Sequence, residues 1–450
     1  MDIKIFKDAL FKKAKEYGFS EYEIYYNSGS SFSVSVFQSE IEEYKNTLYR
    51  GAGFRGLYNG KMGYAFSESI NEDAIEFLLK NAIDNSALIE NEDEKLYKGD
   101  DSYEQTLPVS DNLIDTTVEE KINFALAMEK EALSMDNRIS AVESSVVATA
   151  IGDTYMANSY GLELYKQDGF ATAYVEVTAK DNEDIKISYE VWQGKDFKGF
   201  EPKSVAEKAA SKVLSSLGAQ PVESGKYNII INNQTAIDLI GVYLSAFYAE
   251  NVQKGFSLFA GKMGEAIANP IVNIHDNTDH ENSLTPLSFD SEGVKVKNKT
   301  VVESGVLKTY LYNYKAALKD GINPTGNGFK SSFKGLVSTA CANMFIEPGN
   351  DEFNELVHKL DNGLIINDLS GLHSGCNVIS GDFSLLAEGL KVENGKISKP
   401  VEQITIAGNI FQLLKDITAI GADLKFEPLG IGGSLGSPSL LVENISVAGL

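Results

Sequence analysis

This chain has four histidines and two cysteines, and their side chains can take part in more kinds of chemistry than any others in the sequence. Two histidines fall in the segment 275–280, which reads HDNTDH, and His and Asp side chains are ligands for zinc or manganese. The same composition is typical of a solvated loop after a strand, in which Asp and Asn form turns. We favour the loop. The alternative is a metal site formed by His275, Asp276, Asp279 and His280.

Another histidine lies near a cysteine in the glycine-rich segment 371–382. His373 and Cys376 could form a nucleophilic pair if they came within hydrogen-bonding reach and a third group oriented the base. Glycines in such a segment more often let the backbone turn tightly or approach a ligand closely. We therefore expect this segment to line a peptide groove. The predicted groove residues are His373, Ser374, Asn377, Ser380, Gly381 and Asp382.

Other candidates carry weaker signals. Glu250 and Glu265 could act as an acid/base pair, but nothing in the sequence fixes their separation, and carboxylates are abundant in this chain. The segment 261–265, GKMGE, lacks the spacing of a phosphate-binding loop. Trp192 is expected in the core, and His358 on the surface of a helix. From the residues alone, we predict that this chain has no catalytic residue and no metal ligand.

Length and charge restrict the class of protein. A chain of 450 residues is expected to form two or three domains. Its 64 acidic and 40 basic residues give a net charge of −24, which would repel a phosphate backbone, so we predict no nucleic-acid partner. The acidic cluster 90–94 is the densest run of charge. No apolar stretch is long enough to span a membrane, and the N-terminus has no signal-peptide core. We expect a cytoplasmic protein with reduced thiols.

Residues 1–223 are predicted to form an α+β domain with an internal repeat, at about 1–88 and 116–218. Each repeat reads as a helix, several antiparallel strands and a second helix, and the acidic segment 89–115 links them. The predicted helices are 3–17, 71–85, 118–135 and 204–217. The predicted strands are 21–27, 33–37, 41–49, 51–58, 61–67, 139–150, 154–158, 162–167, 170–180 and 185–192.

Residues 224–450 are predicted to form a β-rich domain, barrel-like or a sandwich, so that the fold class is α+β. An apolar helix is expected over 234–248, after a buried strand at 227–232. Strands are also expected at 271–275, 300–302, 306–311, 440–443 and 446–448. Asn394-Gly395 predicts a tight hairpin turn between two strands. Asn409 is predicted to cap a helix.

Several motifs in the second half occur together and in order. They are SGDF at 380–383, AEG at 387–389, VENG at 392–395, PVEQITIAGN at 400–409, ESGVLKTYL at 303–311 and TGNG at 325–328. In this arrangement the chain resembles the TldD/PmbA family, clearly over 226–450 and weakly over 1–225. Family members of the TldD type are similar to zinc peptidases. Their equivalent of the helix 234–248 carries an HExxxH motif, and a cysteine from a glycine-rich segment near the C-terminus completes the zinc site.

This chain departs from that pattern at each expected ligand. The segment 236–251 reads AIDLIGVYLSAFYAEN and has no histidine, and the segment 430–434, GIGGS, has no cysteine. The resemblance is therefore to the PmbA (TldE) branch, which lacks the HExxxH zinc motif. It implies a zinc-free subunit of a TldD/TldE-type metallopeptidase that proteolyses or trims unfolded or small peptides. It also implies a heterodimer with a zinc-bearing TldD-like homologue, or a homodimer, with zinc held by the partner and no cofactor in this chain.

Two alternatives remain open at this level. The chain could be a stand-alone peptidase whose site has moved to HDNTDH or to His373 and Cys376. It could instead be a non-enzymatic regulator that binds another protein, since some family members have been described as modulators of DNA gyrase. Loss of activity on chelation would indicate the first, and tight binding to a specific protein without peptide turnover would indicate the second.

Overall fold

The computed structural model describes residues 1–90, 94–104 and 108–450, so residues 91–93 of the acidic cluster lie outside the described residues. The N-terminal part repeats one order of elements. Its first half consists of α1 (Ile3–Glu16), β1 (Glu21–Phe37), β2 (Glu40–Tyr58), β3 (Lys61–Ser67) and α2 (Glu72–Ser86). Its second half consists of α4 (Val118–Ser134), β4 (Ile139–Asn158), β5 (Glu163–Asp181), β6 (Asp184–Gly194) and α5 (Pro202–Ser216), preceded by α3 (Asp111–Asp115). The predicted duplication of helix, antiparallel strands and helix is therefore confirmed.

Both halves contribute to one antiparallel sheet, with strand order β3-β2-β1-β4-β5-β6. The strands are longer than predicted, because several expected pairs of short strands are continuous: 21–27 and 33–37 are both parts of β1. Serine and glycine at 28–31 interrupt the hydrophobic alternation without ending the strand. Gly29 is needed there because a Cβ at this position would clash with the backbone carbonyl oxygen of Ile151 on the neighbouring strand.

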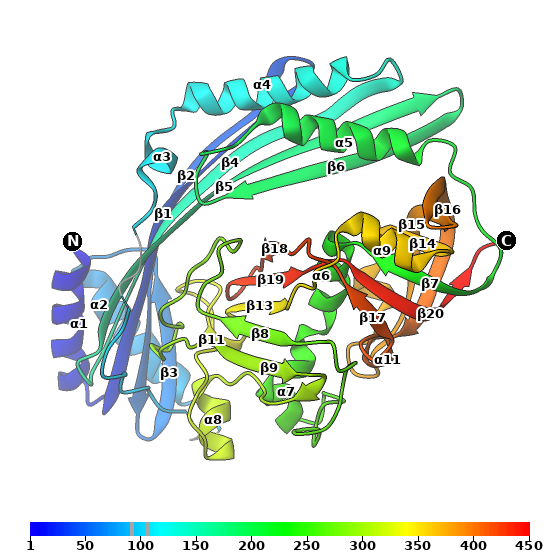
Figure 1. Ribbon diagram of the computed structural model, residues 1–450. Helices are drawn as coiled ribbons and strands as arrows, with labels where there is room; N and C mark the ends of the chain where they lie inside the picture. Colours follow the sequence, from blue (N-terminus) through cyan, green and yellow to red (C-terminus); the bar gives the residue numbers. More distant parts are fainter. Residues whose placement is uncertain (91–93, 105–107) are drawn as a thin grey trace.

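The long sheet has two separate hydrophobic cores, one toward each end. Helices α1 and α2 cover one end, where Phe6, Leu10 and Leu78 are buried. Helices α4 and α5 cover the other end, where Met128 and Val213 are buried. In Figure 1 the sheet curves over the C-terminal part, with the two pairs of helices at its opposite ends.

The C-terminal part contains a closed barrel, which confirms the barrel-like expectation. Its strands follow the order β16-β15-β14-β7-β20, and the pair Ile406↔Val447 joins β20 back to β16. Their bounds are β7 (Gly225–Ile231), β14 (Gly363–Ser370), β15 (Asp382–Glu393), β16 (Lys396–Asn409) and β20 (Leu440–Ala448), with β17 (Ile417–Ile420) paired to β20. Asn394 and Gly395 both have positive φ, 53° and 68°, in the predicted hairpin turn between β15 and β16.

A second sheet lies beside the barrel, in the order β10-β9-β8-β13-β19-β18. Its strands are β8 (Ile274–Asn277), β9 (Lys299–Glu303), β10 (Val306–Leu307), β13 (Asn343–Ile346), β18 (Lys425–Pro428) and β19 (Ser434–Ser437). A separate hairpin pairs β11 (Gly328–Phe329) with β12 (Ser338–Thr339). The helices are α6 (Asn233–Tyr243), η1 (Leu244–Phe247), α7 (Ala249–Gln253), α8 (Tyr314–Asp320), α9 (Phe353–Leu360), α10 (Leu372–Gly375) and α11 (Ile410–Leu413). Over the described residues, no helix is both long and apolar enough to cross a membrane.

Helix α6 packs between the barrel and this second sheet, in the largest hydrophobic core, with Leu239 and Tyr243 buried. It is shorter than the predicted helix 234–248, because the chain tightens into η1 after Tyr243. The helix capped by Asn409 is also shorter than expected. Asn409 accepts a hydrogen bond from the Phe411 amide, but α11 ends at Leu413 and the next apolar residues form β17.

The N-terminal sheet is fastened to the C-terminal part by a buried cluster of charges. Arg55 on β2 donates to both carboxylate oxygens of Glu23 on β1, at 2.8 and 3.0 Å. Lys330, from the C-terminal part, lies 3.3 Å from the same carboxylate, and Glu292 lies 3.9 Å from Arg55. All four side chains are nearly inaccessible to water, with Lys330 the most exposed at 6%. Because a buried charge is costly unless paired, these contacts fix the central strands in place.

Candidate functional site

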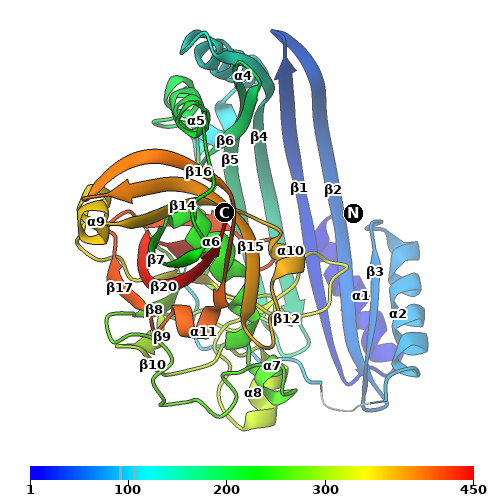
Figure 2. The same cartoon turned by 90° about the vertical axis from the view of Figure 1, so that its right-hand side faces the viewer.

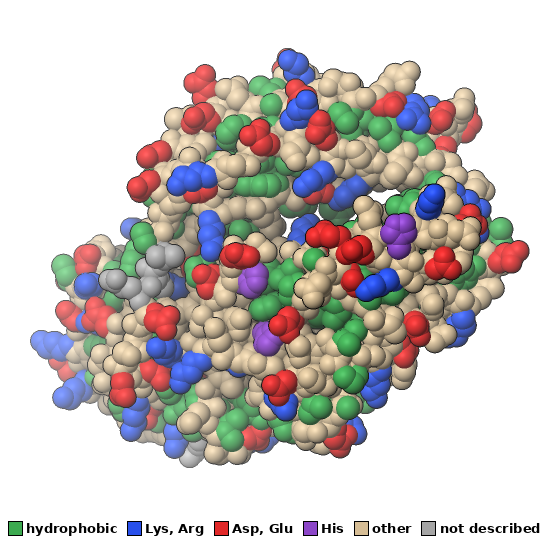
Figure 3. All heavy atoms as spheres, in the orientation of Figure 1, with side chains coloured by type: hydrophobic (Ala, Val, Ile, Leu, Met, Phe, Trp, Pro, Cys, Tyr) green, Lys and Arg blue, Asp and Glu red, His purple; other side chains and the backbone are tan. Residues whose placement is uncertain are grey.

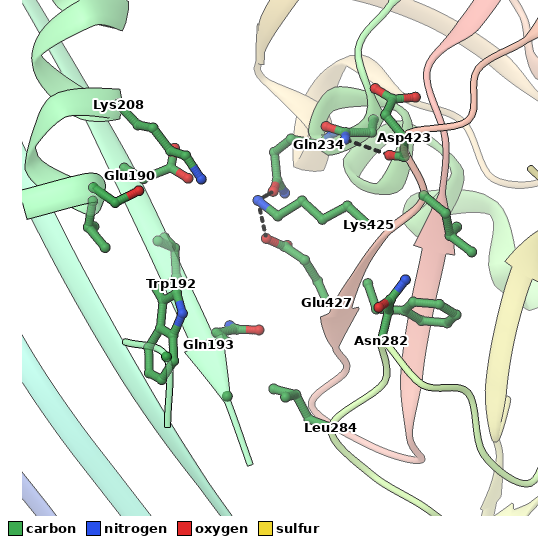
Figure 4. Close-up of a pocket in the computed structure, with 18 of the residues that line it drawn as sticks. Glu190, Trp192, Gln193, Lys208, Gln234, Asn282, Leu284, Asp423, Lys425 and Glu427 are labelled. Atoms are coloured by element: carbon green, nitrogen blue, oxygen red, sulfur yellow. Dashed lines mark hydrogen bonds and ion pairs between the residues drawn. The ribbon is translucent and has the colours of Figure 1, made fainter. Parts of the chain in front are cut away.

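A cleft separates the outer strand of the N-terminal sheet from the C-terminal part. Its larger section has a volume of about 1340 Å³, and the adjoining section has a volume of about 430 Å³. Glu190 and Lys212 line both sections from the N-terminal side, and Gln234 and Lys425 line both from the opposite side. Figure 3 shows the opening between the two parts, and Figure 4 shows the side chains that face each other across it.

Strand β6 forms one wall. Among the described residues it is the last strand of its sheet, paired with β5 and with no strand on its other side. Ile185, Ile187 and Tyr189 share one face of β6 and are 55%, 59% and 43% exposed. The Tyr189 carbonyl points away from β5, where it accepts a long hydrogen bond from Lys212 Nζ (3.4 Å). The cleft is therefore lined by a strand edge that pairs with no other strand among the described residues, and Ile187 and Tyr189 of its apolar row line the section of about 430 Å³.

Trp192 completes this wall. Its indole packs against Phe197, with ring centroids 6.0 Å apart and nearly parallel, and against Phe200 at 4.4 Å. The tryptophan thus contacts the core beneath α5, as expected from the sequence, and it also lines the cleft. Beside it, Glu190 on β6 pairs with Lys212 on α5.

The opposite wall is built at the N-terminus of α6. Asn232 caps this helix by accepting a hydrogen bond from the Thr235 amide at 2.8 Å. Asn233 donates to the Asp423 carbonyl at 2.8 Å, which holds the segment before β18 against the helix. Lys425 Nζ donates to Gln234 Oε1 at 2.5 Å and lies 3.8 Å from Glu427. This wall presents amides and paired charges to the cleft (Figure 4).

Burial shifts the pKa values of several charged groups that line the section of about 430 Å³. Burial, with help from Glu427 and Asp368, raises the pKa of Asp238 to about 6. Burial also raises the pKa of Asp368 and, with the charge of Asp368, the pKa of Glu388. Burial lowers the pKa of the Lys425 ammonium. This section of the cleft therefore changes its charge as the pH passes from weakly acidic to neutral.

Contacts between the two parts bracket the cleft. Near the barrel, Lys186 on β6 pairs with Glu402 on β16 at 2.6 Å. Near the second sheet, Lys195 lies 3.7 Å from Asp279. The ion pairs join the N-terminal sheet to the C-terminal part at separate places, so the strand edge between them keeps a defined distance from α6.

The predicted groove residues lie elsewhere, in α10, in the loop that follows it and at the first residue of β15. His373, Ser374 and Asn377 are exposed, and Ser380 donates to Asp382 Oδ2 at 2.8 Å within the loop. Asp382 Oδ1 also accepts a hydrogen bond from Asn409 at 2.9 Å. Gly381 is buried with a φ of 81°, a left-handed conformation that favours glycine. The six residues all fall within 373–382 but do not line the cleft, and a groove at this segment stays a prediction.

The structure gives the HDNTDH segment a structural role. Asp276 is fully buried and binds Lys299 at 2.9 Å, Asn327 at 2.8 Å and the Ala342 amide at 2.7 Å. His280 packs against the rings of Phe345 and Phe426. Within residues 1–90, 94–104 and 108–450, no group of three or more His, Cys, Asp or Glu side chains is arranged to hold a metal ion.

The two members of each remaining candidate pair lie in different surroundings. His373 is exposed, whereas Cys376 is partly buried near Tyr243. Burial raises the pKa of Tyr243 most, and a hydrogen bond with the Cys376 thiol raises it further. Glu250 accepts a hydrogen bond from the Thr339 amide at 3.0 Å, and Glu265 pairs with Lys262 at 2.7 Å on the surface. His358 lies exposed on α9, as predicted.

Zinc does not fit the residues of α6 and the segment 430–434, where the family resemblance places the ligands. The structure does bring the helix and this part of the chain together, since a Cβ at Gly241 would lie 3.6 Å from Cδ2 of Leu435, the residue after that segment. Leu435 is buried in the same core as Leu239 and Tyr243. The junction is therefore filled by apolar groups, and zinc requires nitrogen, sulfur or oxygen ligands.

Sequence models of one family match most of the chain. The PmbA/TldA metallopeptidase domain 1 matches residues 22–86, the central domain matches residues 111–217, and the C-terminal domain matches residues 224–449. Among curated proteins, the chain is similar to a metalloprotease PmbA homolog of Haemophilus influenzae, with 26% identity over 93% of this chain and 90% of that protein. It is also similar to an uncharacterized protein of Methanocaldococcus jannaschii, with 27% identity over 91% of this chain and 93% of that protein.

Two solved structures share the whole fold. A protein of Thermotoga maritima, described as a candidate modulator of a DNA gyrase, has a TM-score of 0.90 and 31% identity over 99% of this chain and 100% of its own. TldE from Thermococcus kodakarensis has a TM-score of 0.90 and 21% identity over the same shares of the two chains.

Proposed function

The chain belongs to the PmbA/TldD metallopeptidase family, and we propose that it is a peptide-binding subunit without a catalytic zinc of its own, which acts with a zinc-bearing homologue. In this role the chain holds unfolded or small peptides for proteolysis or trimming by the partner's metal. The observation that carries the proposal is the free edge of β6 inside a cleft. We place the complex in the cytoplasm.

An extended peptide suits this cleft for three reasons. The outward amides and carbonyls of β6 can form main-chain hydrogen bonds with a peptide of any sequence, as in strand addition. Ile187 and Tyr189 offer apolar contacts to every second side chain of such a peptide. Across the cleft, the side-chain oxygens of Asn232 and Gln234 each keep one lone pair beside the bonds from Thr235 and Lys425, so each can accept a hydrogen bond from the peptide. The recognition is thus broad rather than specific for one sequence.

The composition of α6 supports the zinc-free part of the proposal. The helix has no histidine or cysteine, and its one ionisable carboxylate, Asp238, faces the cleft rather than the segment 430–435. A single carboxylate cannot replace the three protein ligands of a catalytic zinc site. The chain's own residues therefore bind and orient the peptide, and hydrolysis falls to the partner.

Peptide binding by the purified chain tests the cleft directly, with fluorescence anisotropy of a labelled unstructured peptide as the readout. Val191→Pro removes an amide that points to the same side as the Tyr189 carbonyl, because backbone direction alternates along a strand. We expect the peptide affinity to fall by about tenfold or more, because the variant loses a main-chain hydrogen bond and the proline ring would clash with the bound peptide. The circular dichroism spectrum should not change.

His373→Ala is the matched control at the predicted loop groove, because its side chain is exposed and outside the cleft. It is expected to leave the affinity unchanged. A loss of affinity in His373→Ala with normal binding by Val191→Pro would move the peptide site to the loop 373–382. Normal binding by both variants would contradict the cleft and the loop alike.

A further inference from the structure

The N-terminal duplication places a second cavity at the opposite edge of the sheet. Strand β3 is the third strand of the first half, as β6 is of the second, and both are terminal strands of the sheet among the described residues. Each is followed by a helix, and Figure 2 shows β3 and α2 at one side of the sheet and β6 and α5 at the other. Asn85 on α2 donates to the Tyr64 carbonyl of β3 at 2.8 Å, which repeats the bond from α5 to the outer carbonyl of β6. The two edges are therefore built alike where β3 covers β2, from Ala52 to Tyr58.

The cavity at β3 has a volume of about 330 Å³ and lies between β2, β3, α2 and the loop 330–337, which joins β11 to β12. Arg55, Tyr64 and Leu336 also line an adjoining section of about 810 Å³. The loop approaches β2 closely, because a Cβ at Gly53 would lie 2.2 Å from the Phe333 carbonyl oxygen. Glycine at this position therefore lets the loop form a wall against the strand. A cavity of this size is typical of sites for small organic molecules.

Large apolar side chains form part of the lining and remain accessible to water. Phe66 on β3 is 48% exposed, and Phe77 on α2 is 53% exposed. Leu336 of the loop is 64% exposed. The ring of Phe333 lies 6.4 Å from the ring of Phe66, with the two planes at 65°. An aromatic body bound here would cover these groups and gain favourable ring contacts.

The charged side chains that line the section of about 330 Å³ are all basic. They are Arg55, Lys330 and Lys334. Within the part of the chain that the structure describes, no Asp or Glu lines this section, although the chain has 64 acidic residues. In the adjoining section, Arg55 and four lysines accompany three glutamates. The cleft at β6 is the reverse, because acidic side chains outnumber basic ones there. The cavity at β3 is therefore suited to an anion.

The buried partners of Arg55 and Lys330 do not balance both positive charges. Burial opposes the ionisation of Glu23, but Arg55 and Lys330 outweigh it and lower the pKa of this shared carboxyl group. Burial raises the pKa of Glu292, the other carboxyl group near Arg55, so this group ionises less readily. Burial also lowers the pKa of Lys330 to about 8, which leaves the lysine protonated at neutral pH. Positive charge therefore remains at the wall of the cavity, and a bound anion would pair with it.

We propose that the cavity at β3 binds a small organic anion with an aromatic body, a carboxylate or a phosphate attached to one or two rings. The rings lie against Phe66, Phe77 and Leu336, and the anionic group lies toward Lys330 and Lys334. This site goes beyond the proposed function, because it lies at the other edge of the sheet and needs neither a peptide nor a zinc-bearing partner.

Titration calorimetry of the full chain with 2-naphthoate is the first test, and binding is expected. The uncharged 2-naphthamide has nearly the same shape and is expected to bind at least about tenfold more weakly, because it leaves the basic groups without an anion. Acetate, which has the charge without the rings, should not bind measurably. 2-Naphthyl phosphate is the second anion, and whichever anion binds more tightly identifies the anionic group. Equal affinities for 2-naphthoate and 2-naphthamide, or no binding of either anion, would overturn the proposal.

Two variants place the anion in the cavity. Lys334→Met removes a basic group whose ion pair with Glu68 is exposed, so the fold should not suffer, and it is expected to weaken 2-naphthoate binding by about tenfold. Phe77→Ala removes an exposed ring from the wall and should weaken binding as well. Lys80→Met is the matched control, because its ion pair with Glu76 is exposed and it does not line the cavity.

The same titration on Val191→Pro separates this site from the cleft at β6. The variant alters the cleft and should bind 2-naphthoate as the parent protein does. Loss of binding in Val191→Pro, with normal binding by Lys334→Met and Phe77→Ala, would place the anion in the cleft and overturn the proposal. A chain that binds 2-naphthoate but no peptide would overturn the proposed function alone.

Discussion

The two edges of the N-terminal sheet differ in what covers them. The edge at β6 faces the C-terminal part of the same chain, and the ion pair between Lys186 and Glu402 sets its distance from the barrel. The edge at β2 faces solvent from Glu40 to Arg50. A free edge inside a cleft admits only a single extended chain, whereas an edge on the outside can accept a whole second sheet. The two edges of one sheet therefore differ in the size of the group that can pair with them.

The two edges can differ in this way only if the middle of the sheet is held in place. We therefore expect the largest loss of stability from a variant in the buried charge cluster there. Arg55→Met leaves Glu23 buried beside Lys330 alone. Breaking such a buried pair costs about 3–5 kcal/mol of unfolding free energy, measured by urea denaturation. Lys45→Met is the control, because its ion pair with Glu43 is exposed and contributes at most about 1 kcal/mol. Equal effects of the two variants would show that the buried cluster does not fasten the sheet.

The next effect separates the edges from each other. Val191→Pro at the β6 edge is expected to weaken peptide binding by about tenfold. Arg50→Glu at the β2 edge is expected to leave peptide binding unchanged, because Arg50 is exposed and outside the cleft. Anisotropy on both variants measures the two effects side by side. Equal losses of affinity would show that the peptide does not bind at the β6 edge.

A smaller effect concerns the pH dependence of the cleft. The pKa of Asp238 is raised from 3.8 to about 6, so the folded chain binds a proton there that the unfolded chain has released. Unfolding free energy should fall as the pH rises through this window, because ionisation is costlier in the folded state. Asp238→Asn should match the parent protein in thermal stability near pH 4 and exceed it near pH 7. Asp181→Asn, at an exposed position, is the control and should not gain stability over the parent protein between these two pH values.

The smallest effect is expected at the end of the cleft. Lys186→Met removes the ion pair with Glu402, which is partly exposed and contributes about 1 kcal/mol or less. Hydrogen exchange of the β6 amides should nonetheless become faster, since the strand loses a contact that holds it near the barrel. Exchange that rises equally in β2 would mean that the variant loosens the whole sheet.

Much of the fold could be predicted from the sequence. The hydrophobic alternation located the strands, Asn394-Gly395 located a hairpin turn, and the order of elements indicated the duplication. Strand length was underestimated where serine and glycine interrupt the alternation, as at residues 28–31. The continuity of β1 depends on its pairing with β2 and β4 on both sides, and pairing is not visible in local periodicity.

The cleft was harder to predict than the fold. The alternation of Ile185, Ile187 and Tyr189 with polar residues indicated a strand, but not that its apolar face would stay exposed. Edge position depends on the order of strands in the sheet, and the facing residues Gln234 and Lys425 are distant in sequence from β6. The glycine-rich loop 373–382 attracted attention because its composition is unusual, while the cleft is lined by ordinary residues.

The central claim is that the chain supplies a peptide-binding surface and its partner supplies the metal. The most direct test is the zinc content and peptidase activity of the purified chain, alone and co-expressed with a zinc-bearing family member. We predict no tightly held zinc and no activity in the chain alone, with both present in the mixed complex. About one tightly held zinc per chain in the protein alone, with peptide turnover, would contradict the claim, because a zinc site needs at least three protein ligands from this chain.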